Sequence, residues 1–201
     1  MEEAYKNYDV VFYEDTIHTT VTADPNIVSN WISAIKHFHR YNLVVGLDVE
    51  WRPSCNSFQN HVATVQICVG NCCLIYQIIH STNRFTQSLI DFLSNDDFTF
   101  VSVDVQSDFN VLKTDYEMRC NPRTVDLRML TASALDWSDL NRHGLKTLAS
   151  LVLGKEMDKL KRVRTSNWNT SWLTDEQVNY ACIDVFVSFK IGKVLKAYYW
   201  S

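Results

Sequence analysis

The chain has 201 residues, 46% of them hydrophobic and 21% charged, and its formal net charge at pH 7 is -4. This length can bury a full core, and the low counts of 5 glycines and 3 prolines argue against disordered segments, so we expect one domain over residues 1–201. The negative charge excludes a protein that holds nucleic acid by bulk electrostatic attraction alone.

Neither a membrane span nor secretion is expected. The longest apolar runs have the length of strands and are interrupted by charges. Residues 1–6 lack the basic-then-apolar order of a signal peptide, which predicts an intracellular protein, in the nucleus or the cytoplasm. The 6 cysteines include no C-x-x-C pair with a matching partner, so they are predicted to be small buried hydrophobic residues rather than zinc ligands.

The first elements are strands followed by a helix. Residues 10–21 alternate apolar and β-branched side chains, which predicts one or two edge strands. A helix is expected next, because Asp24 is a favourable N-cap and Pro25 suits the first helical position. Apolar residues then recur at helical spacing to about Tyr41.

Three strands are expected in the next part of the chain. They cover residues 43–51, 62–69 and 72–78, with a polar loop over residues 52–59 and a tight turn at Gly70 and Asn71. Short connections between neighbouring strands favour an antiparallel meander.

Strands and helices alternate in the rest of the chain. The apolar spacing predicts a helix over residues 85–93, a strand over 98–103, and a helical segment opened by Asp108 that breaks near Pro122. A short strand and helix are expected from Thr124, followed by a helix over 144–154 that is ended by glycine. The last helix begins at the capping box of Thr174 and Gln177 and extends to about Leu195. Antiparallel strands followed by this alternation indicate an α/β fold, a mixed sheet flanked by helices, whose strand order the pattern leaves open.

Two carboxylates end the strand of residues 43–51. Asp48 and Glu50 are two residues apart, so both side chains project from the same face of the strand. Buried like charges this close resist ionisation unless a cation neutralises them, and hard cations such as Mg²⁺ or Mn²⁺ prefer oxygen ligands. The pair is therefore interpreted as half of a metal site. The alternative is two solvated carboxylates at a strand end.

A second pair of polar residues lies on the last helix. Tyr180 and Asp184 are four residues apart and share a face, with Ser188 one turn further on. On the inner side of this largely apolar helix, a phenol and a carboxylate would need partners, since an unpaired buried charge is costly. The alternative is a pair at the surface.

These residues together resemble the DEDDy subgroup of 3′-5′ exonucleases, and most closely the RNase D and Werner-syndrome helicase exonuclease-domain family. The resemblance rests on Asp48-x-Glu50, on Asp108, and on Tyr180-x-x-x-Asp184. It covers about residues 42–191 and extends to the segments 62–67, 148–154, 161–168 and 173–184. It implies a ribonuclease H-like exonuclease fold and metal-dependent hydrolysis of phosphodiester bonds at the 3′ ends of nucleic acids.

The chain departs from the family pattern beside the third acid. Relatives often have glycine where this chain has Ser107, and Asp104 adds a carboxylate four residues before Asp108. Asp104 is either a competing metal-facing acid or an ordinary residue at a strand end. The register of the motif favours Asp108 as the ligand.

The resemblance also implies a role for each residue. Two Mg²⁺ or Mn²⁺ ions would lie about 4 Å apart, as in other two-metal sites. Asp48 would bridge both ions, Glu50 and Asp184 would hold the ion that activates water, and Asp108 would hold the second. Tyr180 would orient the attacking water, because the ordinary phenol pKa of about 10 makes it a poor base at neutral pH.

Candidate contacts with the nucleic acid are aromatic and basic. Trp51 and Phe109 flank the acids and are candidates for stacking on terminal bases, with core packing as the alternative. Residues 155–164 carry five basic side chains against two acidic ones, which predicts phosphate contacts as readily as a solvated basic face. The three cations predicted to contact the substrate backbone are Lys161, Arg162 and Arg164.

Two rival functions and several partners remain open. A catalytically silent nucleic-acid-binding module would more often have lost a ligand, and a hydrolase of small phosphate substrates is disfavoured by the basic segment. DNA and RNA are both open as substrates, and any helicase partner would be a separate polypeptide. Three aromatic residues, 198–200, suggest self-association as a homo-oligomer unless they fold back onto their own domain.

Overall fold

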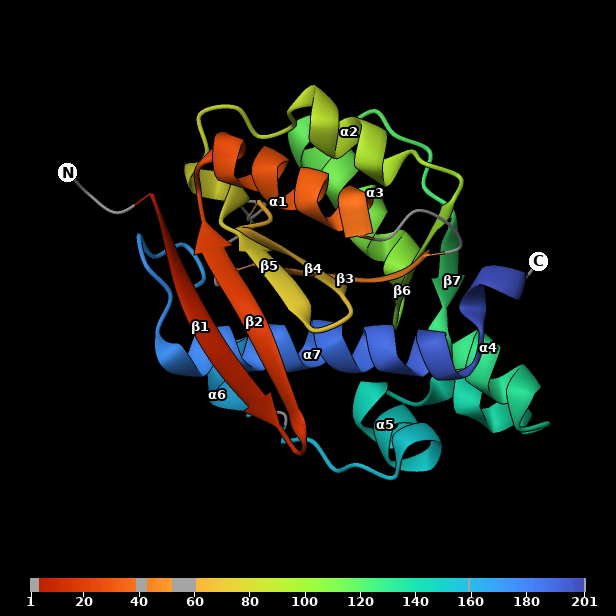
Figure 1. Cartoon of the computed structure of the whole chain (residues 1–201). Coiled ribbons are helices and arrows are strands. Elements are labelled where there is room, and N and C mark those ends of the chain that lie inside the picture. The colour runs from red at the N-terminus through yellow and green to blue at the C-terminus, as the bar shows by residue number, and fades with distance from the viewer. Residues whose placement is uncertain (1–3, 39–42, 52–60, 159, 201) are drawn as a thin grey trace.

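A computed structural model describes residues 4–38, 43–51, 61–158 and 160–200. One sheet of seven strands has the order β1-β2-β5-β4-β3-β6-β7 (Figure 1). The strands are β1 (Tyr5–Phe12), β2 (Asp15–Thr22), β3 (Leu43–Glu50), β4 (Thr64–Val69), β5 (Cys72–Tyr76), β6 (Phe98–Ser102) and β7 (Thr124–Asp126). The helices are α1 (Pro25–Phe38), α2 (Gln87–Leu93), α3 (Val105–Tyr116), α4 (Leu127–Ala134), α5 (Leu145–Leu153), α6 (Lys161–Arg164) and α7 (Asp175–Val194).

The sheet is mixed, as the sequence predicts. β3, β4 and β5 form the expected antiparallel meander, and β1 and β2 form an antiparallel hairpin. The pairs β2–β5, β3–β6 and β6–β7 are parallel. The strands at the start of the chain were both candidates for the edge, but only β1 lies there, because β2 pairs with β5 on its other side.

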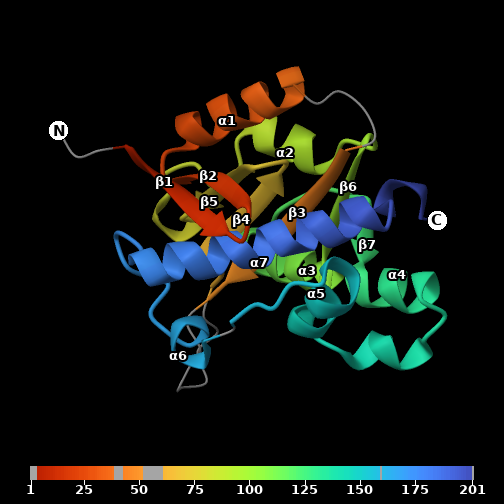
Figure 2. The same cartoon turned by 60° about the horizontal axis from the view of Figure 1, so that its bottom comes forward.

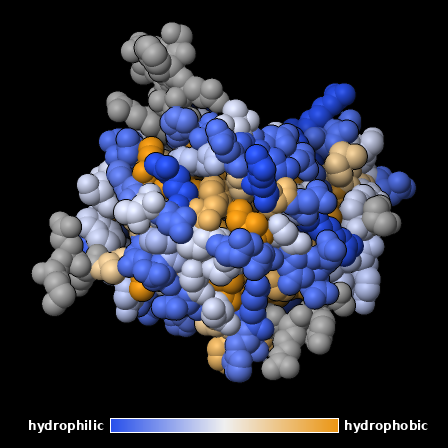
Figure 3. All heavy atoms as spheres, turned by 90° about the horizontal axis from the view of Figure 1, so that it is seen from above, coloured by the Kyte–Doolittle hydropathy of each residue, from blue (hydrophilic) through white to orange (hydrophobic). Residues whose placement is uncertain are grey.

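Helices cover both faces of the sheet. The core formed with α1, α2 and α3 takes the odd-numbered residues of β3, including Val45 and Leu47. The core on the opposite face, where α7 crosses the sheet, takes Val44 (Figures 1 and 2). Alternate residues of β3 therefore face different cores, and Asp48 and Glu50 belong to the face that α7 covers. The outer surface over α1 is mainly hydrophilic, with small separate hydrophobic patches (Figure 3).

A glycine allows the close approach of α7 to the sheet. A Cβ atom added to Gly46 would clash with the backbone carbonyl oxygen of Val185, and one added to Gly192 would crowd the side chains of Val44 and Val101. The absence of a side chain at Gly46 thus lets α7 rest directly on β3. This contact is adjacent in sequence to Asp184, so it sets how near that carboxylate lies to the end of β3.

Most helix boundaries agree with the sequence pattern. The capping box of α7 is present, since the Thr174 hydroxyl accepts from the backbone N–H of Gln177 and the Gln177 side chain accepts from the Thr174 N–H. Asp24 accepts a hydrogen bond from the Asn26 N–H at the start of α1, and α5 ends at Gly154 in the left-handed region, with φ of 64°. The predicted loop over residues 52–59 and the predicted end of the first helix at Tyr41 lie outside the described residues.

The start of α3 corrects one expectation. Asp108 was expected to open this helix, but the helix begins at Val105 and Asp108 lies within its first turn. The physical reason is the left-handed conformation of Asp104, with φ of 68°, which turns the chain from β6 into the helix three residues earlier. Aspartate tolerates this conformation better than most residues.

The aromatic end of the chain largely folds back. Tyr198 and Trp200 pack against the core under α7, and the Arg123 guanidinium donates hydrogen bonds to both of their carbonyl oxygens, at 2.7 and 3.2 Å. Tyr199 is 71% exposed. Self-association stays a prediction, with one large ring rather than three to support it. In the described part of the chain, no helix combines the length and apolar character that crossing a membrane requires.

Candidate functional site

A cavity of about 500 Å³ lies where β3 and β6 end. Because these strands are parallel neighbours, their carboxyl ends meet at one edge of the sheet, the usual place for a site in an open α/β sheet. We call this the carboxylate cavity. The side chains that line it are Asp48, Val49, Glu50, Trp51, Val103, Asp104, Ser107, Asp108, Arg164, Thr165, Tyr180 and Asp184.

The two acids of β3 occupy the last part of that strand. Asp48 lies opposite Gln66 and Glu50 opposite Thr64 in the antiparallel register with β4. Their shared face is the one covered by α7, so the same-face prediction is confirmed. Glu50 is buried and Asp48 is partly buried. The alternative of two freely solvated carboxylates does not describe this pair.

Asp108 reaches the cavity from the first turn of α3. Its carboxylate is buried and accepts a hydrogen bond from the Ser102 hydroxyl at 3.0 Å. Burial, and then the nearby charge of Asp48, raise the pKa of Asp108 to about 9 despite this hydrogen bond. The charged form of Asp108 is therefore unfavourable unless a cation or another positive group compensates it.

Tyr180 and Asp184 reach the cavity from α7. Both side chains are buried, so the alternative of a surface pair is wrong. Burial, and then the charges of Asp184 and Glu50, raise the pKa of the Tyr180 phenol well above its ordinary value. At neutral pH the phenol is therefore protonated and can donate a hydrogen bond into the cavity. Its ring lies against the indole of Trp168, with the ring centres 6.1 Å apart.

Asp104 also lines the cavity but has partners outside it. Its carboxylate lies 3.4 Å from the Arg128 guanidinium, and its backbone N–H donates to the carboxylate of Asp126 at 3.2 Å. Arg128 in turn forms a closer ion pair with Asp126, at 2.6 Å. Asp104 thus shares an arginine with Asp126 and its side chain is 56% exposed, whereas Asp108 is buried beside Asp48, which favours Asp108 as the acid that an ion would use.

The two aromatic candidates differ in position. Trp51 is 43% exposed and lines the carboxylate cavity, where its ring is open to a ligand. The prediction that Phe109 stacks on a base is wrong. Phe109 is fully buried in the core beneath α3 and packs edge-on against Phe100, with the ring centres 5.6 Å apart. On a helix, adjacent residues diverge by about 100°, so Asp108 can face the cavity while Phe109 faces the sheet. Phe109 cannot stack on a base.

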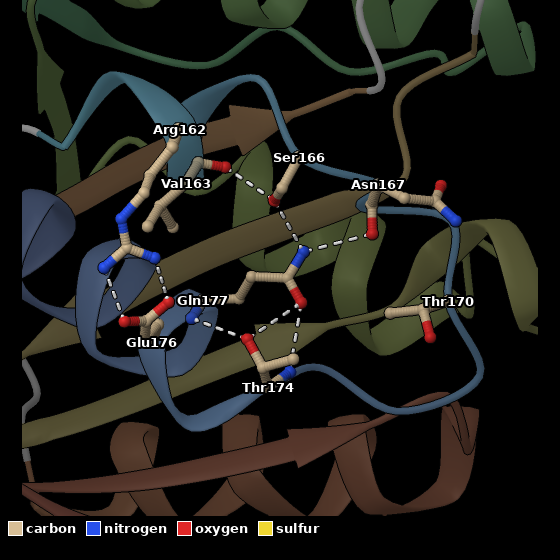
Figure 4. A pocket seen from close by; sticks show the side chains of 8 residues that line it. All are labelled: Arg162, Val163, Ser166, Asn167, Thr170, Thr174, Glu176 and Gln177. Carbon is tan, nitrogen blue, oxygen red and sulfur yellow. Dashed lines mark hydrogen bonds and ion pairs between the residues drawn. The ribbon is translucent and has the colours of Figure 1, made fainter.

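The three basic candidates also differ in their position relative to the carboxylate cavity. All belong to α6, but of the three only Arg164 lines the carboxylate cavity. Arg162 pairs with Glu176 through two hydrogen bonds of 2.5 and 2.6 Å (Figure 4). That ion pair borders a second pocket of about 370 Å³, and Lys161 is exposed on the surface of α6.

The chemistry of the carboxylate cavity fits a hard divalent cation in donor type. Its candidate ligands offer only oxygen, from four carboxylates, which is the preference of Mg²⁺ and Mn²⁺. In the described part of the chain, no three carboxylate, imidazole or thiol side chains are already close enough together to hold an ion between them. The strands and helices thus bring the acids to one cavity, but among the described residues no three of them are close enough to surround one ion.

Sequence reasoning missed Ser102 and Thr165. Ser102 ends β6 and is the hydrogen-bond partner of Asp108, while Thr165 follows Arg164 and lines the cavity. Neither residue carries a local signal, because serine and threonine are common at the ends of strands and helices. Only their position next to the acids marks them.

Comparisons with known proteins point to one family. The sequence profile of a family described as 3′-5′ exonuclease matches residues 20–198. A 3′-5′ exonuclease of Arabidopsis thaliana is 35% identical over 155 residues, which are 76% of this chain and 52% of the plant protein. The chain spans about half the length of the curated relatives it matches.

Solved structures support the same fold. RNase D of Escherichia coli, described as an exoribonuclease involved in structured RNA processing, superimposes with a TM-score of 0.73 at 17% identity, over 89% of this chain and 44% of that one. NrnC of Brucella melitensis with bound Mg²⁺ superimposes with a TM-score of 0.61 at 21% identity, over 79% of this chain and 74% of that one. At these identities the likeness shows an RNase D-like exonuclease fold.

Proposed function

Because the chain belongs to the 3′-5′ exonuclease family, we propose that it is itself an active, metal-dependent exonuclease that hydrolyses phosphodiester bonds at the 3′ ends of nucleic acids. The observation that carries this proposal is the carboxylate cavity. Four of its five acids, the proposed metal ligands, and a tyrosine come from three separate elements and lie at the carboxyl ends of two parallel strands. A catalytically silent relative would not need to retain all five.

The proposed cofactors are two Mg²⁺ or Mn²⁺ ions, held by Asp48, Glu50, Asp108 and Asp184. The raised pKa of Asp108 supports a bound cation, because positive charge would stabilise the carboxylate form that burial and Asp48 disfavour. Bound Mg²⁺ in the structural neighbour NrnC gives further support. When bound, such ions lower the pKa of a water molecule and stabilise charge on the departing oxygen.

The side chains around the acids would orient the reactants. Tyr180, kept protonated by its raised pKa, would hydrogen-bond the attacking water or a phosphate oxygen rather than remove a proton. The guanidinium of Arg164 would contact a phosphate oxygen of the substrate backbone. Trp51 would stack on the terminal base, because its exposed ring borders the same cavity.

A degradation assay tests the proposal. Purified protein is incubated with 5′-labelled single-stranded RNA, single-stranded DNA and duplexes with a recessed 3′ end, each with Mg²⁺, Mn²⁺ or EDTA. We expect stepwise shortening from the 3′ end of at least one substrate, only with metal. The matched control is Asp48→Asn, which keeps the size of the side chain and removes its charge. No shortening by the parent chain, or equal shortening by Asp48→Asn, would reject the proposal.

A further inference from the structure

Gln177, in the first turn of α7, is a buried polar residue that uses both ends of its side-chain amide (Figure 4). It is 5% exposed. Its Oε1 accepts from the backbone N–H and the hydroxyl of Thr174, at 3.0 and 3.4 Å. Its Nε2 donates to the Ser166 hydroxyl at 2.9 Å and to the Asn167 carbonyl oxygen at 3.0 Å. All four hydrogen-bonding positions of the amide are thus occupied.

The two ends of this amide have separable tasks. The oxygen completes the capping box of α7, a task that glutamate performs equally well at the same position. The amino group does not contribute to the cap, because it points to the segment that follows α6. Capping therefore accounts for an oxygen at this position but not for a glutamine.

The amino group connects α7 to the backbone on either side of Arg164. The Ser166 hydroxyl, which accepts from Gln177, donates in turn to the Val163 carbonyl oxygen at 2.6 Å. A second contact reaches the same place, since the Trp168 indole donates to the Arg164 carbonyl oxygen at 3.1 Å. The backbone of Arg164 is thus fixed from two sides by groups that rest on α7.

The exposed ion pair between the same elements is a weaker link. Arg162 and Glu176 also join α6 to α7, but their side chains are 64% and 56% exposed. Solvent and salt screen a pair of this kind, so it contributes little to holding the two elements together. The buried amide is not screened in this way, and losing its partners would leave polar groups unsatisfied.

We propose that Gln177 is a positioning residue that holds Arg164 in the carboxylate cavity, where Arg164 contacts the phosphate backbone at a nucleic-acid 3′ end. The inference rests on the proposed function and extends it. Gln177 lies three residues before Tyr180 and seven before Asp184, so all three share a face of α7. One rigid helix thereby sets Arg164, Tyr180 and Asp184 relative to one another.

The decisive variant is Gln177→Glu, which has nearly the same shape and keeps the oxygen that caps α7. It replaces the two donors with a carboxylate that faces the Asn167 carbonyl oxygen. We expect the KM for a 5′-labelled oligonucleotide to rise about tenfold with a smaller change in kcat, because substrate binding loses an arginine contact. Oligonucleotide binding without metal, followed by fluorescence anisotropy, should lose about 0.7 from its salt slope, the value of one phosphate contact to a single strand.

Three comparison variants make this result specific. Thr174→Ala removes the hydroxyl that caps α7 but leaves the Nε2 donors, so its KM and salt slope should equal those of the parent chain. Arg164→Gln should show the same loss of salt slope as Gln177→Glu. The double variant Gln177→Glu/Arg164→Gln should have the same KM as Arg164→Gln alone, because both substitutions remove the same contact between Arg164 and the phosphate backbone. Ser166→Ala serves if Gln177→Glu does not fold, and it should also raise the KM.

Each outcome decides the matter. A parent chain without nuclease activity overturns the proposed function and this inference with it. With an active parent chain, a KM and salt slope unchanged in Gln177→Glu overturn the inference alone. The inference is also overturned if the effects of Gln177→Glu and Arg164→Gln on KM add in the double variant. If Gln177→Glu does not fold, Ser166→Ala replaces it, and an unchanged KM in Ser166→Ala then overturns the inference.

Discussion

The carboxylate cavity and the pocket of Figure 4 are both lined by residues of α6, but their charges are balanced in opposite ways. Five acidic residues and one arginine line the cavity, while one arginine and one glutamate line the pocket and pair with each other. The pKa of Asp108 is raised to about 9 by burial and by Asp48. The pKa of Glu176 is lowered by its hydrogen bonds from Arg162. Charge is balanced internally in the pocket, whereas the cavity favours a cation from outside.

Removing an acid from the carboxylate cavity should have the largest effect on hydrolysis and so tests this contrast most directly. Asp48→Ala should reduce hydrolysis below detection while the fold stays intact, because a metal ligand is lost. In metal-free buffer its melting temperature should equal or exceed that of the parent chain, since the repulsion between the close carboxylates of Asp48 and Glu50 disappears. Circular dichroism and the degradation assay measure the two effects. Parent-level activity with Mn²⁺ would show that Asp48 is not a ligand.

The next effect concerns a neutral group in the same cavity. Tyr180→Phe should lower the rate by about 10²- to 10⁴-fold, the range for one positioned catalytic group. The Mn²⁺ concentration that gives half of the maximal rate should change little, because the phenol is not proposed as a ligand. Single-turnover kinetics over a series of Mn²⁺ concentrations measures both. An unchanged rate would make Tyr180 a packing residue that rests on Trp168.

Metal should distinguish the two regions by stability as well as by rate. Adding Mn²⁺ at about 100 times its dissociation constant should stabilise the parent chain by roughly 2.7 kcal/mol, because the ion binds the folded state. Glu176→Gln should be stabilised equally, since its pocket is not proposed to bind metal, but Asp48→Ala should not. Thermal shifts with Mn²⁺ and with EDTA measure this. Equal stabilisation of Asp48→Ala would locate the ion elsewhere.

The two arginines of α6 offer a smaller and sharper comparison. Arg164→Gln should weaken oligonucleotide binding and flatten its salt dependence by about 0.7 in slope, as expected for one lost phosphate contact on a single strand. Arg162→Gln should leave that slope almost unchanged, because its guanidinium is engaged by Glu176 outside the cavity. Equal salt slopes for the two variants would show that α6 is a solvated basic face and that Arg164 does not contact a phosphate.

The smallest effect is the stability contribution of the ion pair in the pocket. The pKa of Glu176 is lowered from 4.5 on folding, so the pair stabilises the folded chain above that pH and loses its effect as pH falls through the lowered pKa. Glu176→Gln should therefore have a slightly lower melting temperature than the parent chain at pH 7, and this difference should shrink as the pH is lowered below 4.5. Because both side chains are largely exposed, 0.5 M salt should remove the difference at pH 7. A difference that persists in salt would contradict the exposed-pair interpretation.

Local patterns were sufficient for most of the elements and for some of the site. Short connections between strands predicted the meander, the period of two placed Asp48 and Glu50 on one face, and the capping box located the start of α7. These features depend on residues within about four positions of one another, so a single sequence carries the information. The left-handed conformation of Asp104, which has no local signature strong enough to predict it, moved the start of α3 near the site.

Which side chains meet was decided by long-range packing. Asp108 and Asp184 reach the acids of β3 because β6 pairs in parallel with β3 and because Gly46 lets α7 lie on that strand. The same packing turned Phe109 into the core, although it adjoins Asp108 in sequence. The sequence by itself determined which residues have the chemistry for a cation and a phosphodiester. Sheet order and helix orientation decided which of them line one cavity, because those depend on contacts between residues far apart in the chain.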